Sequence, residues 1–328
     1  SALRVKRDVL GSSSAGLILL AKTPTDGLSN QTAGADFRYN PTREVKISGA
    51  VAQTATEGEG GDGAAVNLDA LWTGEYSWAG GYYGDIEEDF NAEMGFISRT
   101  GVRDQGAFAG HRLRLHDPTF RSVAIYTDYG MTGDRDGRVL ERDSSARLEV
   151  QLESGDSANV WYGRTWSYLD GPWDIREGIT IPGGMHRWHK YGFHFGTDER
   201  RMVRVQTINE LTGFYGGTRL WISATGHVRP TARLLFTADY NFNSVDLPAG
   251  EFQTNAVNGR AIYNFSADMF AKLFVQWNDD SNRVRANALL RYTYRPGSDL
   301  YIVYKELWQG GDVQDRAIIG KLVYFLNL

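Results

Sequence analysis

The chain has 328 residues, 38 of them glycine, with no cysteine and a formal net charge of -5. The absence of cysteine excludes disulfides and thiolate metal sites, and the acidic balance argues against a nucleic-acid surface. The longest apolar run, residues 15–21, is far shorter than the roughly 18 residues of a membrane-spanning helix.

Residues 1–11 precede the first strongly patterned segment. We expect them to be a periplasmic lead-in or, alternatively, an additional strand. From residue 12 onward, alternation of apolar and polar side chains replaces any helical period, which indicates strands with one apolar and one polar face. In residues 283–295, for example, apolar side chains alternate with arginines at 283, 285, 291 and 295. In chain order, the pattern predicts strands over 12–23, 31–40, 44–56, 63–73, 75–86, 105–116, 120–133, 143–153, 157–169, 187–198, 201–213, 218–229, 231–243, 251–265, 269–281, 283–295, 299–309 and 315–328.

The length of these segments favours a membrane protein. Soluble strands average about 5–6 residues, whereas runs of about 11–14 residues suit tilted strands that cross a bilayer. A soluble β-sandwich or a β-helix is the alternative. The predicted fold is all-β: an antiparallel, up-and-down transmembrane β-barrel of about 18 strands that occupies residues 12–328.

Short and long connections alternate along the chain. The long ones are 57–62, 87–104, 134–142, 170–186, 244–250 and 310–314. Bacterial outer-membrane barrels have short periplasmic turns and longer extracellular loops. The sequence therefore predicts a bacterial outer-membrane location with both termini in the periplasm.

Aromatic residues on the apolar faces gather near the predicted strand ends, as expected for two girdles at the membrane interfaces. One group, toward the extracellular side, is Phe242, Trp277 and Trp308; the other, toward the periplasm, is Tyr263, Phe265, Tyr292, Tyr294 and Tyr324. The last strand alternates Leu322, Tyr324, Leu326 and Leu328 up to the final residue, which reads as an assembly signal.

Several segments resemble a family of bacterial outer-membrane barrels of unassigned function. They are Arg4-Val-Lys-Arg-Asp-Val-Leu-Gly with Gly16-Leu-Ile-Leu-Leu-Ala, Phe274-Val-Gln-Trp-Asn, and the run from Arg291 that contains Arg-Pro-Gly-Ser-Asp-Leu. In that family a carbohydrate-binding family-9-like module precedes the barrel. The resemblance implies an upstream periplasmic module and supplies no catalytic residues.

The polar strand faces predict a basic lumen wall, made of Arg219, Arg229, Arg233, Arg260, Lys272, Arg283, Arg285 and Arg291. Acidic residues cluster around the long loop 87–104 instead: Asp85, Glu87, Glu88, Asp89 and Glu93. In general porins the third extracellular loop folds inward and places acids opposite arginines. The same constriction is one hypothesis for residues 87–104; a solvated loop at the rim, with wall arginines paired locally, is the other.

These features predict a channel for small polar, anionic or sugar-like solutes. A closed barrel that anchors a periplasmic carbohydrate-binding module or a partner protein is the alternative. We find no positive case for an enzyme, and no cofactor or metal site is predicted, because His189 and His194 point to opposite faces of one strand. The expected partners are membrane lipid, lipopolysaccharide and the barrel-assembly machinery, with no nucleic acid.

Overall fold

The computed structural model describes residues 1–23, 29–57 and 62–325. Nineteen strands form one antiparallel sheet in which each strand pairs with the next along the chain. They are β1 (Ala2–Val9), β2 (Ser13–Lys22), β3 (Asn30–Tyr39), β4 (Val45–Thr56), β5 (Gly63–Thr73), β6 (Ser77–Ile86), β7 (Val102–Arg114), β8 (Phe120–Asp134), β9 (Val139–Leu152), β10 (Ser157–Leu169), β13 (Gly184–Gly196), β14 (Val203–Phe214), β15 (Gly217–Thr231), β16 (Leu234–Leu247), β17 (Gly250–Asn264), β18 (Met269–Asn278), β19 (Arg283–Arg295), β20 (Ser298–Gln309) and β21 (Asp312–Val323). A separate hairpin, β11 (Trp173–Arg176) and β12 (Ile179–Ile181), lies between β10 and β13 in the chain.

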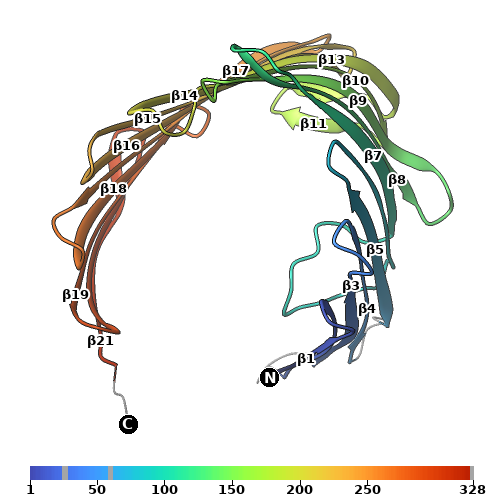
Figure 1. Cartoon of the computed structure of the whole chain (residues 1–328), viewed down its shortest axis with the longest axis horizontal. Coiled ribbons are helices and arrows are strands. Elements are labelled where there is room, and N and C mark those ends of the chain that lie inside the picture. The colour runs from blue at the N-terminus through green and yellow to red at the C-terminus, as the bar shows by residue number, and fades with distance from the viewer. Residues whose placement is uncertain (24–28, 58–61, 326–328) are drawn as a thin grey trace.

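The sheet is strongly curved, and β1 and β21 lie at its two ends (Figure 1). Among the described residues no pairing joins β1 to β21. The connection 87–101 and the β11–β12 hairpin both lie inside the curve (Figure 1). We call the side that they occupy the concave face and the opposite side the convex face.

Strand register assigns every side chain to one face, because directly paired residues point the same way and neighbours along a strand point opposite ways. Thr32 pairs with Thr54, which pairs with Gly63, and Asn91 of the 87–101 connection bonds to Thr54. Thr32, Thr54 and Gly63 therefore mark the concave face. Their neighbours Ala33, Gln53 and Ala64 mark the convex face.

The all-β, antiparallel, up-and-down architecture is confirmed, and the strand count is refined. The eighteen expected strands are present, although their ends shift by a few residues, and β1 adds a nineteenth to the sheet. Residues 2–9 thus form a strand paired with β2, from Ala2 opposite Leu20 to Val9 opposite Ser13. An odd count places Ser1 and Val323 at opposite edges of the sheet, so the two described chain ends do not share one edge as predicted.

Some connections are shorter than expected because the alternating pattern continues through them. β16 runs to Leu247 and β17 begins at Gly250, so 244–250 is a tight hairpin rather than a long loop. The expected loops 134–142 and 310–314 shrink to 135–138 and 310–311 in the same way. The edge with the long connections 23–29, 57–62, 87–101 and 170–183 is called the loop edge, and the other the turn edge. Leu326 and Leu328 of the proposed assembly signal lie outside the described residues.

Burial in this sheet is unlike that of a soluble sandwich. The buried apolar side chains of the described segments are Phe90, Val102, Ala124, Leu140, Ile179, Ile181, Val245 and Leu247. Large apolar side chains instead stand exposed on the convex face, including Tyr191 at 56% and Val160 at 49%. A second protein layer would have covered such residues, so the described residues exclude the β-sandwich alternative.

Candidate functional site

The concave face carries most of the predicted basic wall. Arg219 lies on β15 and pairs with Val245, Arg260 lies on β17 opposite Thr237, and Lys272 lies on β18 opposite Ile262. β19 presents three more arginines to the same face, Arg283, Arg285 and Arg291.

One predicted wall residue lies elsewhere. Arg233 lies in the turn 232–233, just before β16 begins at Leu234. A two-residue hairpin, which the alternation does not show, replaces the strand there. Arg229 stays in β15 near the turn edge, where the β15–β16 register shifts between Val228 and Thr231.

The wall arginines differ in how their charge is balanced. Arg291 forms an ion pair with Asp299 at 3.0 Å, and Arg219 donates to the Asn243 carboxamide oxygen at 2.7 Å. The Arg260 guanidinium lies 5.5 Å from the centre of the Phe274 ring. Within the described ranges no carboxylate lies within 4.0 Å of Arg260, Lys272 or Arg285. Their positive charge is therefore not balanced by a carboxylate of the described residues.

A hollow of about 310 Å³ lies beside this wall near the loop edge. Arg283 and Arg285 of β19 line it, together with the side chains of Asn258 and Gln276. Gln276 donates to the Asn258 oxygen at 3.3 Å. Guanidinium and amide groups around one hollow, with no carboxylate in its lining, suit a small anion.

The β7–β14 part of the concave face has acidic side chains that sequence reasoning did not single out. Asp143 on β9 binds the Lys190 ammonium on β13 at 2.6 Å, and Glu210 on β14 accepts the Trp161 indole N–H at 3.2 Å. They line a second hollow, of about 520 Å³, together with Asp128 and Arg147. The alternation that identified the basic wall also places these acids inward, so applying it to every strand would have found them.

The acidic residues predicted around the 87–104 loop do not form one cluster. Asp85 belongs to β6, points to the convex face, and binds Arg103 at 2.9 Å and Arg135 at 2.8 Å. Glu88 and Asp89 are exposed. The carboxylate of Glu87 accepts the Ala64 backbone N–H at 2.8 Å.

The 87–101 connection folds onto the concave face of β2–β5. Glu93 binds Lys22 at 2.6 Å, and Phe90 is buried against the backbone near Gly63. This segment thus enters the concavity, as one hypothesis required, but it packs on the first strands of the sheet. The basic wall lies on β15–β19, toward the other end of the sheet, and the constriction role remains a prediction.

The β11–β12 hairpin is the second segment inside the curve. Ile179 and Ile181 pack with Val245 and Leu247 of β16 and form the one buried apolar cluster of the described residues. Trp173 at its start packs edge-on against Tyr215, with ring centres 5.8 Å apart. The long connection expected over 170–186 therefore contains a hairpin that covers the ends of β14–β17.

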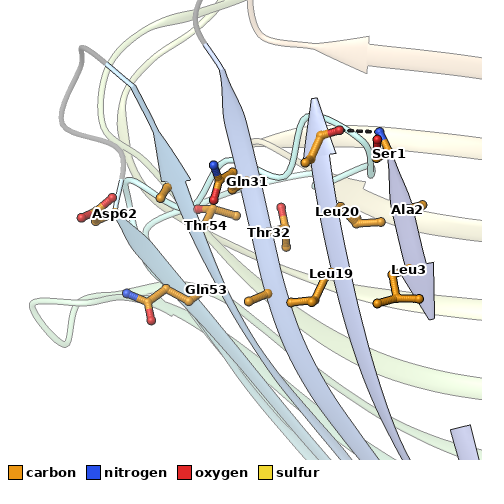
Figure 2. Close-up of a pocket in the computed structure, with 13 residues that line it drawn as sticks. Ser1, Ala2, Leu3, Leu19, Leu20, Gln31, Thr32, Gln53, Thr54 and Asp62 are labelled. Atoms are coloured by element: carbon orange, nitrogen blue, oxygen red, sulfur yellow. Dashed lines mark hydrogen bonds between the residues drawn. The ribbon is translucent and has the colours of Figure 1, made fainter. Parts of the chain in front are cut away.

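A third hollow, of about 450 Å³, lies at the N-terminal end of the sheet, where β1–β4 reach the loop edge. Figure 2 shows Leu3, Leu19, Gln31 and Gln53 around it, with Asp62 at one side. The Ser1 nitrogen lies 2.6 Å from the Ala21 carbonyl oxygen. The four first-named residues belong to the convex face by register, so this hollow lies on the apolar side of the sheet.

The predicted girdle residues within strands lie on the convex face by register: Phe242, Trp277, Trp308, Tyr263, Tyr292 and Tyr294. Phe265 and Tyr324 follow the ends of β17 and β21 and are exposed. Their role as membrane girdles remains a prediction.

Metal and helical-membrane features are not found in the described part of the chain. Its residues include no group of three or more His, Asp or Glu side chains placed to hold a metal. No helix of sufficient length and apolarity to cross a membrane occurs there either.

The geometry defines a class: an all-β protein built on one curved, up-and-down antiparallel sheet, with an apolar convex face and a polar concave face. Four chains of known structure match, among them one described as "Copper transporter OprC". That similarity has a TM-score of 0.49 and 9% sequence identity, and it covers 94% of this chain and 66% of that chain, just under two thirds of its length. No protein-family model and no curated protein matches the sequence.

Proposed function

We propose that the chain is the wall of a transmembrane β-barrel in a bacterial outer membrane and that it conducts small polar solutes with a preference for anions. The observation that carries this proposal is the separation of faces over nineteen strands of mostly 10–15 residues. The convex face exposes large apolar side chains and the concave face is polar. Lipid chains can contact the apolar convex face, and the water of a lumen can hydrate the polar concave face.

The anion preference rests on the uncompensated cations of β17–β19, namely Arg260, Lys272 and Arg285. Fixed cations raise the local concentration of anions, most strongly where walls of low dielectric constant focus the field. Asn258 and Gln276 beside Arg285 add donors and acceptors for neutral polar groups, so sugar-like solutes fit the same wall.

The test is conductance of the purified full chain in planar bilayers. Under a KCl gradient, the reversal potential reports the ratio of anion to cation permeability. We expect steady channels whose reversal potential indicates that anions are more permeant than cations. A folded protein, verified by its β-sheet circular dichroism, that never conducts would eliminate the channel.

A second function is proposed from a different observation. The 87–101 connection and the β11–β12 hairpin both occupy the concave side (Figure 1), and Phe108, Phe274 and Leu289 point there by register. These segments and side chains would narrow the lumen, which favours a closed barrel that anchors a periplasmic carbohydrate-binding module or a partner protein. A folded, non-conducting protein would support this function. We propose lipid, lipopolysaccharide and the barrel-assembly machinery as partners in either case.

A further inference from the structure

Three arginines surround one indole ring on the convex face. Trp166 on β10 pairs directly with Arg142 on β9 and with Arg187 on β13. Arg164 lies two positions before Trp166 on the same strand and points the same way. The guanidinium carbons of Arg142 and Arg164 lie 5.8 and 5.2 Å from the centre of the Trp166 ring. We call these four residues the arginine patch.

No carboxylate balances the arginine patch. Among the described residues, none of its three arginines takes part in an ion pair. The Nε of Arg142 is buried and has no hydrogen-bond partner, and its terminal nitrogen reaches only the Met131 sulfur, at 3.8 Å. Arg164 and Arg187 are exposed, so their guanidinium groups can bind an external acceptor.

Two other charged groups on the convex face are compensated within the chain. Asp85 binds both Arg103 and Arg135 near the loop edge. Glu306 on β20 binds Arg316 on β21. The arginine patch differs from these pairs because it gathers three positive charges with no acid.

The surroundings of the patch indicate what supplies the acceptor. Toward the turn edge, the same face of β9, β10 and β13 continues as an exposed apolar surface made of Leu148, Val160, Tyr162, Tyr191 and Phe193. Toward the loop edge, β10 ends three residues after Trp166, at Leu169. The patch therefore borders the apolar surface at one end of the strands. In a membrane-spanning sheet this is the depth of lipid headgroups, where indole rings and arginines are stable.

We propose that the arginine patch binds the phosphate of a lipid headgroup, specifically lipopolysaccharide in the leaflet at the loop edge. The planar guanidinium fork matches phosphate oxygens in pairs. The acyl chains then lie along the apolar surface from Leu148 to Phe193. This inference rests on the proposed membrane location, and it is independent of whether the barrel conducts.

The experiment is native mass spectrometry of the detergent-solubilised full chain, titrated with diphosphoryl lipid A. The test variant is R142Q/R164Q/R187Q. The matched control is R38Q/R43Q/R114Q, which removes three exposed charges at the turn edge that are unpaired within the described residues. We expect the test variant to bind at least about tenfold more weakly than wild type, as loss of charge-assisted hydrogen bonds predicts. The control should bind as wild type does.

Further arms identify the source of the phosphate. Lipid A stripped of both phosphates should bind wild type as weakly as diphosphoryl lipid A binds the test variant. Equal binding of the stripped lipid would overturn the proposal. Inorganic phosphate that bound wild type as tightly as diphosphoryl lipid A would overturn the assignment to a lipid. If the triple variant does not fold, by circular dichroism, R187Q alone serves, because Arg187 is exposed; unchanged affinity in a folded variant would also overturn it. A wild-type protein that binds lipid A without conducting would refute the channel and leave the lipid site intact.

Discussion

The Asn30 carboxamide donates a hydrogen bond to the backbone carbonyl of Asn91 over 2.8 Å and 61 positions of sequence. The Asn91 N–H in turn donates to the Thr54 hydroxyl at 3.0 Å. Asn30 is 2% exposed and Thr54 is fully buried. One residue of the 87–101 connection is thus held at both of its backbone polar groups by two strands of the wall.

Removing this attachment should loosen the connection. In N30A, the Asn91 carbonyl loses a partly buried hydrogen bond, a cost of about 0.5–1.5 kcal/mol. We expect trypsin to cut after Arg99 faster than in wild type by about tenfold, the equivalent of about 1.4 kcal/mol. N258A, on the concave face of β17, is the control. An unchanged cutting rate in N30A would show that other contacts hold the connection.

A methyl group at Gly63 should have a similar effect for a different reason. A Cβ built on Gly63 would lie 2.1 Å from the Phe90 backbone nitrogen, so the connection must move away. We expect G63A to be destabilised by about 1–3 kcal/mol, as overpacking usually is, and to expose the Phe90 region to hydrogen exchange. G259A is the matched control, because nothing lies within 4 Å of a Cβ at Gly259. Equal protection in the two variants would contradict the packing.

Charge selectivity should depend on the uncompensated part of the wall. R260Q/K272Q/R285Q removes three cations that have no acid partner, so anion permeability should fall and the reversal potential under a KCl gradient should move toward zero. R291Q/D299N is a contrasting change because it removes an ion pair and leaves the net charge unchanged. We expect a smaller shift for R291Q/D299N than for the triple variant. A shift of equal size would mean that paired arginines also attract solutes.

Two turns at the turn edge should lose stability in acid. The Asp198 carboxylate accepts hydrogen bonds from the Arg200 side chain and backbone, which lowers the pKa of Asp198 from 3.8 to about 2. The Asp156 carboxylate accepts the Asp198 backbone N–H at 2.8 Å, which also lowers the pKa of Asp156.

Because these pKa values are lowered in the folded state, the stabilisation is complete above pH 3.8 and is lost as the pH falls through about 2. The melting temperature of wild type should therefore exceed that of D198N at pH 5, and the gap should close toward pH 2. D136N, in a turn at the other edge, is the control. A gap that stays constant with pH would rule out the ionised carboxylate as its cause.

The alternation of side chains was enough to predict the strands and their faces, because a strand has a period of two regardless of its neighbours. The same rule placed Arg219, Arg260 and Arg285 on the concave face. It failed at Arg233, where a tight turn replaces the strand. It also could not show that Asp85 points away from the loop acids, since register across β6 and β7 decides that. The packing of Ile179 and Ile181 on β16 could not be predicted from the alternation, because it depends on residues about 65 positions away in the sequence.

The nineteenth strand has a geometric consequence for the two margins of the sheet. β1 leaves the loop edge for the turn edge, and so does β21, which means that they run in the same direction. Direct contact between them would create a parallel ladder, with slanted and evenly spaced bonds, in a sheet otherwise built only from antiparallel pairs. Parallel pairing is slightly less stable per residue than antiparallel pairing. A β1–β21 contact would therefore be the weakest junction between strands of this sheet and the first to separate.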